Sequence, residues 1–85
     1  VAVTGPRLTI DVSQPVNAQI DQLTEFDPHY IHTYPSNLLA LGMGLHERSI
    51  ELKSLVHLRT FGEMLEPLTK QRIETYFGVP VWDTY

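Results

Sequence analysis

Apolar positions alternate with polar ones in some stretches and recur every three or four residues in others, and this change of period separates expected strands from expected helices. Residues 8–12 alternate as in a half-buried strand. Pro15 then suits the first position of a helix. The alternating apolar residues are Leu8, Ile10 and Val12, and those at helical spacing are Val16, Ile20 and Leu23. The first quarter of the chain therefore predicts a strand followed by an amphipathic helix.

A second strand and helix follow the break at Asp27-Pro28. Residues 30–34 form a β-rich run that stops at Pro35, and Ser36 is a plausible N-cap for the next helix. The apolar face of that helix carries Leu38, Leu41 and Leu45, with Leu39 widening it. Gly42 and Gly44 each weaken a helix by about 1 kcal/mol relative to Ala, so we expect its far end to fray.

A third unit of the same kind completes the chain. Residues 56–61 predict a strand, Gly62–Glu66 a turn, and Pro67 the start of a helix that Gly78 ends. Residues 79–82 open a fourth strand. The order βαβαβαβ predicts an α/β fold, with a mostly parallel sheet and right-handed crossover helices.

The size of the chain limits how well such a sheet is covered. A chain of 85 residues hides only about 60–65% of its unfolded surface, and a parallel sheet normally needs helices on both faces. Three crossover helices do not supply both layers. We therefore expect exposed apolar surface and self-association through it.

Composition excludes several classes of function. Six Lys and Arg stand against ten Asp and Glu, and the basic residues are scattered, which argues against nucleic acid binding. No apolar run approaches the roughly 18 residues that span a bilayer, so we expect no membrane partner. The absence of cysteine excludes disulfides and thiolate zinc sites. With no targeting segment at Val1–Gly5, a cytoplasmic protein is expected.

Three local patterns invite a catalytic or metal reading, and each has a simpler explanation. His29 and His32 are three apart, which on a strand places them on opposite faces, so no metal site is expected. Ser36 lacks the flanking glycines of a nucleophile elbow and reads as a helix cap. Gly42 and Gly44 lie inside a helical pattern with no Lys followed by Ser or Thr, so they are not a phosphate loop.

Two strand tips carry the remaining candidate chemistry. The turn 60–65 joins a strand to a helix, and Gly62 permits a flat ligand to approach the backbone. Asp83 and Tyr85 stand at the next tip. An ordinary βα turn with an acidic residue near a helix N-terminus explains the same residues, and local chemistry alone favours that simpler reading.

Four blocks, taken in order, resemble consecutive segments of the adenylate-forming enzymes, and most closely their phenylacetate-CoA ligase and coenzyme F390 synthetase branch. The blocks are Tyr34-Pro-Ser-Asn-Leu-Leu-Ala-Leu41, Ile50-Glu-Leu-Lys-Ser-Leu55, Thr60-Phe-Gly-Glu-Met-Leu65 and Phe77-Gly-Val-Pro-Val-Trp-Asp-Thr-Tyr85. The resemblance covers residues 26–85 well and the first 25 loosely. It implies that residues 1–85 are a single fragment of the N-terminal, adenylate-binding domain of a larger ligase.

The resemblance also implies roles for individual residues. Enzymes of this family use ATP with Mg²⁺ to activate a small-molecule carboxylate as an acyl-adenylate, and usually pass the acyl group to coenzyme A. Nucleotide binding maps to Gly62, Glu63 and Met64 along the adenine, to Asp83 at its amino group and to Tyr85 on its face. Substrate binding maps to Tyr34, Pro35 and Ser36, which border the acyl pocket.

Some family features are not in these 85 residues. Phe61 replaces the usual Gly or Ser, and the phosphate loop, the ribose-binding Asp, the Gly-x-Thr-Glu continuation after Tyr85 and the catalytic Lys are missing. We therefore expect the chain alone to be inert and to hold no cofactor, because nothing stabilises adenylyl transfer. The alternatives are a stand-alone α/β module that binds a nucleotide or a protein, and a purely structural assembly surface.

Overall fold

The structure is a computed structural model of the chain, and it describes residues 11–83. Helices and strands alternate along these residues, as the periodicity predicts. They are α1 (Val16–Phe26), β1 (Tyr30–Thr33), α2 (Pro35–Glu47), β2 (His57–Thr60), α3 (Pro67–Phe77) and β3 (Val81–Asp83). The α/β fold class expected from the sequence is confirmed.

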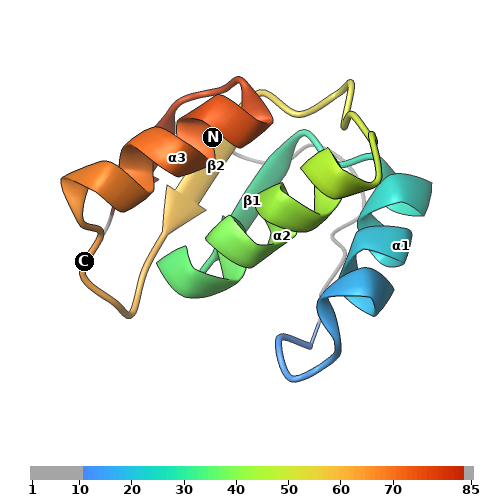
Figure 1. The fold of residues 1–85 in the computed structure, drawn as a ribbon, viewed down its shortest axis with the longest axis horizontal. Coiled ribbons are helices and arrows are strands. Elements are labelled where there is room, and N and C mark those ends of the chain that lie inside the picture. The colour runs from blue at the N-terminus through green and yellow to red at the C-terminus, as the bar shows by residue number, and fades with distance from the viewer. Residues whose placement is uncertain (1–10, 84–85) are drawn as a thin grey trace.

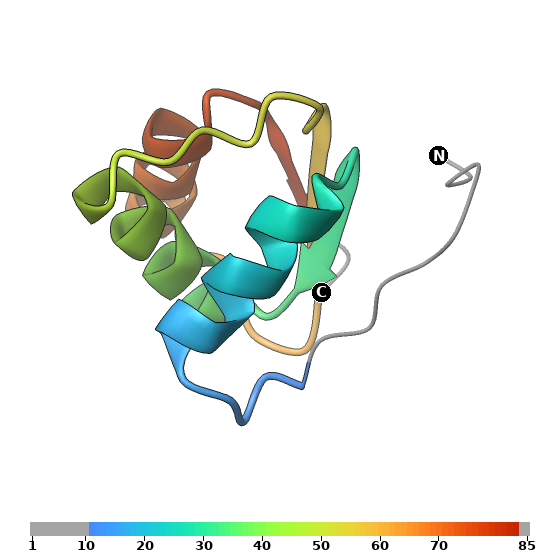
Figure 2. The ribbon, with the colours of Figure 1, turned by 90° about the vertical axis from the view of Figure 1, so that its right-hand side faces the viewer.

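The strands form one parallel sheet in the order β1-β2-β3. All three helices lie on the same side of this sheet (Figures 1 and 2). Both crossovers step to the adjacent strand in the same direction, so right-handed connections place α2 and α3 on one face. The core lies between helices and sheet, and its buried apolar residues are Ile20, Leu23, Ile31, Leu38, Leu41, Leu45, Leu55, Leu58, Ile73 and Val81.

The segment before α1 differs from the expected strand. Leu8 and Ile10 lie outside the described residues, and Val12 sits in a turn with 46% of its surface exposed. The Asp11 carboxylate accepts hydrogen bonds from the Ser13 N–H at 2.9 Å and the Ser13 hydroxyl at 2.8 Å. This local pattern closes a turn in place of a sheet ladder, so extending the strand to Val12 was wrong.

Helix α2 runs unbroken to Glu47, so the expected fraying at its glycines does not occur. A Cβ at Gly42 would lie 3.0 Å from Cβ of Tyr76 in α3, and a Cβ at Gly44 would lie 2.5 Å from Cδ1 of Ile20 in α1. The two glycines thus let α2 pack closely between its neighbours, and that packing outweighs their low helix propensity.

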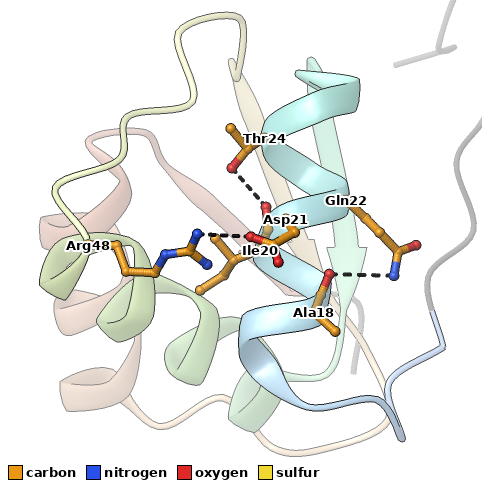
Figure 3. Close-up of polar contacts among 6 residues, drawn as sticks. All are labelled: Ala18, Ile20, Asp21, Gln22, Thr24 and Arg48. Carbon is orange, nitrogen blue, oxygen red and sulfur yellow. Dashed lines mark hydrogen bonds and ion pairs between the residues drawn. The ribbon is translucent and has the colours of Figure 1, made fainter.

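Polar contacts also tie α1 to the segments beside it. Arg48, just after α2, donates to Oδ1 of Asp21 at 2.9 Å (Figure 3). Asp27 ends α1 in the left-handed conformation, and its carboxylate accepts from the Ser54 hydroxyl at 2.6 Å. The Arg48 pair is exposed and contributes at most about 1 kcal/mol. The Asp27 contact anchors the connector that leads into β2.

Candidate functional site

The three parallel strands end at one edge of the sheet, and the described candidate residues lie on or just beyond that edge. β1 ends at Thr33, β2 at Thr60 and β3 at Asp83. In open α/β sheets, ligands bind in the crevice outside the carboxyl ends of the strands. We call this the carboxyl edge and take it as the candidate site. Tyr85 lies outside the described residues.

Helix α2 follows β1 directly, and the side chain of its N-cap residue makes no capping hydrogen bond. Tyr34 is the N-cap in an extended conformation, and Pro35 takes the first helical position. Ser36, which we expected as the N-cap, lies inside the first turn. That prediction was wrong because the fixed φ of Pro35 already suits a helix start. No side-chain cap from Tyr34 satisfies the first-turn N–H groups.

Glu63, on the loop after β2, supplies the missing acceptor. The Ser36 N–H donates to Oε1 of Glu63 at 3.0 Å, and the Ser36 hydroxyl donates to Oε2 at 3.1 Å. A carboxylate at a helix N-terminus also interacts favourably with the helix dipole. The contact joins two segments that the sequence analysis assigned to different pockets, and their separation of 27 residues left no local signal for it.

Gly62 and Tyr34 make a second contact between the same segments. Gly62 has a φ of 79°, and a Cβ there would lie 2.5 Å from Cε1 of Tyr34. The Tyr34 ring also packs against Phe61, with centroids 4.8 Å apart. Glycine is therefore required at this turn both by its backbone conformation and by the ring that lies against it.

Asp83 is anchored by the neighbouring strand. Thr33, Thr60 and Asp83 occupy one register row across the sheet. The fully buried Thr60 donates its hydroxyl hydrogen bond to Oδ1 of Asp83 at 3.0 Å. Met64, two residues beyond Gly62, is 69% exposed. The carboxyl edge thus combines the Asp83 carboxylate, which is fixed by the neighbouring strand, with a solvent-exposed loop at Met64.

A buried polar network that the sequence analysis missed lies behind this edge. The side-chain amides of Gln19 and Asn37 exchange hydrogen bonds at 3.2 and 3.0 Å, and Asn37 also donates to the Thr33 hydroxyl at 3.2 Å. Gln19 is only 2% exposed. A polar residue beside Ile20 on the apolar side of an amphipathic helix was the available signal. The network fixes α1 and α2 relative to the end of β1.

The sheet face that the helices leave uncovered carries a run of rings. Tyr30 and His57 stack with centroids 5.3 Å apart, and His57 stacks on Trp82 at 6.3 Å. His32 meets the edge of Phe61 at 4.5 Å. Burial, reinforced by the Arg59 guanidinium, lowers the pKa of His57 below its usual value, and the same causes lower the pKa of His32. Both imidazoles are thereby favoured in the neutral form.

Other parts of the described chain hold less suitable chemistry. A shallow hollow lies at the opposite edge, between the ends of α2 and α3 and the 50–55 connector, but its lining includes no candidate site residue. In residues 11–83 no three His, Asp or Glu side chains approach closely enough to hold a metal ion. No helix within this range is long and apolar enough to cross a bilayer.

The chemistry available at the carboxyl edge is recognition. Segments 33–36 and 60–66, with Asp83, contain acidic side chains and no Lys or Arg. Such an edge repels phosphate groups, whereas loop backbone and a carboxylate suit the edge of a neutral base. If a nucleotide binds here, its base therefore lies toward the Gly62–Met64 turn and Asp83, and its phosphates are held elsewhere.

Comparison with known proteins gives similarity only at the level of solved structures. No family model matches the chain, and no curated protein does. An open conformation of 2-hydroxyisobutyryl-CoA ligase, in complex with 2-HIB-AMP and CoA, matches 80% of the chain at 25% identity with a TM-score of 0.68. The same ligase in its postadenylation state, with R3-HIB-AMP, matches 80% at 25% identity and 0.69. The chain spans only 17% and 15% of these two structures.

Proposed function

We propose that this chain is part of the N-terminal domain of an ATP-dependent ligase that activates a carboxylate as an acyl-adenylate and transfers the acyl group to coenzyme A. The observation that carries the proposal is the match of 80% of the chain to 2-hydroxyisobutyryl-CoA ligase. The ordered sequence blocks also support it, because they resemble segments of the adenylate-forming enzymes.

Within that ligase, the carboxyl edge contributes to the adenine and acyl pockets. The turn Gly62–Met64 lies along the adenine, the Asp83 carboxylate accepts from the adenine amino group, and Tyr85 packs on the base. Tyr34, Pro35 and Ser36 border the acyl pocket. The acidic character of the described edge fits base recognition. Phosphate and Mg²⁺ ligands belong to other segments of the longer protein, and ATP supplies the adenylyl group.

Among the possible carboxylates we favour the aromatic acids of the phenylacetate-CoA ligase branch, because that branch gave the closest resemblance in sequence. The short hydroxy acid of the structural neighbours is the competing substrate class. The test is to express the protein from its complete coding sequence and measure carboxylate-dependent pyrophosphate release with ATP and Mg²⁺. Phenylacetate, benzoate, 2-hydroxyisobutyrate and acetate form the panel, with and without coenzyme A.

We expect pyrophosphate release with one acid class and acyl-CoA formation when coenzyme A is present, whereas residues 1–85 alone remain inactive. Release with 2-hydroxyisobutyrate but not with the aryl acids would overturn the branch and leave the ligase standing. No release with any carboxylate, from a coding sequence that ends near residue 85, would favour the alternative, a small α/β module that binds a nucleotide or protein.

A further inference from the structure

We propose that Glu63 is a positioning residue that couples the adenine side of the site to the acyl side, an inference that rests on the proposed function. Its carboxylate is shared between the N–H and the hydroxyl of Ser36, at 3.0 and 3.1 Å. Glu63 belongs to the loop assigned to the adenine, and Ser36 belongs to the helix start assigned to the acyl group.

Two adjacent contacts join these segments and fix their register. The Tyr34 ring lies against Gly62, where an added Cβ would come within 2.5 Å of it, and Ser36 binds Glu63 next along the loop. The two pairs run in the same direction along both segments. The loop backbone at Gly62 and the side chain of Glu63 are therefore both held at the start of α2. The loop cannot shift without breaking one of these two contacts.

The start of α2 is the rigid partner in this pair. α2 packs closely between α1 and α3 through Gly42 and Gly44, and Leu38 in its first turns is fully buried. The loop is the more exposed partner, since Met64 is 69% exposed and Glu66 makes no side-chain capping bond to α3. Glu63 thus transmits the fixed position of α2 to an exposed loop.

This geometry predicts a specific kinetic signature. A residue that only touched the nucleotide would change the KM for ATP alone. A residue that only stabilised the fold would lower the melting temperature and leave both KM values unchanged. A coupling residue changes the KM values for ATP and for the carboxylate together. Without it, the loop that borders the adenine and the helix start that borders the acyl group are no longer held in register.

The experiment compares three variants of the complete enzyme. Glu63→Ala removes the acceptor, Glu63→Gln keeps an oxygen that accepts from the Ser36 N–H, and Glu66→Ala removes an equal charge from the same loop as a matched control. We expect Glu63→Ala to raise both KM values on the order of fivefold to tenfold, the size of a lost helix cap, with kcat changed less than about twofold. Glu63→Gln restores most of the loss, and Glu66→Ala resembles the wild type.

The outcomes separate this inference from the proposed function. A wild-type enzyme that activates a carboxylate while Glu63→Ala raises only one KM, or neither, overturns the coupling and leaves the ligase intact. An equal effect of Glu66→Ala also overturns it, because loop charge would then explain the result. A wild-type enzyme that releases no pyrophosphate overturns the proposed function, and the coupling with it.

Discussion

Replacing Gly62 and Gly78 by Ala in parallel isolates the energetic effect of the Tyr34 ring. Both glycines are left-handed, with φ of 79° and 73°, so a Cβ costs about 1–2 kcal/mol at either position. The narrower unfolded ensemble of Ala returns about 0.4–1 kcal/mol in both. Backbone conformation alone therefore predicts nearly equal losses of stability.

The surroundings of the two positions differ. A Cβ at Gly78 meets nothing within 4 Å, whereas a Cβ at Gly62 would lie 2.5 and 2.8 Å from two Tyr34 ring atoms. Overpacking of this kind costs about 1–3 kcal/mol. We expect Gly62→Ala to exceed Gly78→Ala by that amount in the free energy of unfolding. With an m value of about 1 kcal/mol/M, the urea midpoints would differ by about 1 M or more.

The assay is urea unfolding of the 85-residue chain followed by circular dichroism at 222 nm. Repeating both substitutions in a Tyr34→Ala background completes a double-mutant cycle, in which the excess cost of Gly62→Ala should fall below about 0.5 kcal/mol. Equal losses at Gly62 and Gly78 in the Tyr34 background would refute the reasoning. So would an excess that persists after the ring is removed.

Three further perturbations test the packing of α2, the titration of His57 and the exposure of Trp82. Gly42→Ala should destabilise the chain in urea despite a helix-propensity gain of about 1 kcal/mol, because the added methyl meets Tyr76; a stabilised variant would contradict this. The folded-state pKa of His57 is lowered, so the unfolded state binds the imidazole proton more readily than the folded state does. The free energy of unfolding is therefore unaffected above the unfolded pKa near 6.5, and it decreases as the pH falls from there through the lower folded pKa. The urea midpoint should therefore decrease as the pH is lowered from 7.5 to 5.5, and it should decrease less in His57→Phe. Trp82, 56% exposed on the sheet face away from the helices, should make sedimentation of the chain concentration-dependent, and Trp82→Lys should weaken that dependence; unchanged monomer behaviour of the wild type would argue against self-association.

Much of the fold was predictable because it depends on local signals. Pro67 at the first helical position and Gly78 at the left-handed end of α3 lie where their backbone preferences place them. The alternation of β-rich runs with helical periods was sufficient for the α/β class and the parallel order. The boundaries of the strands and the cap of α2 were less accurate, since Pro35 and Ser36 offered competing starts.

The sequence by itself determined the order and approximate positions of the three helices within residues 11–83 and of the strands between and after them, because these depend on neighbours a few positions away. Only the tertiary structure decided that Gly42 and Gly44 are packing positions and that Glu63 caps α2. The tertiary structure also decided that the rings of Tyr30, His57 and Trp82 stack along the sheet face away from the helices. These outcomes depend on the approach of segments far apart in the chain, and local periodicity carries no information about such contacts.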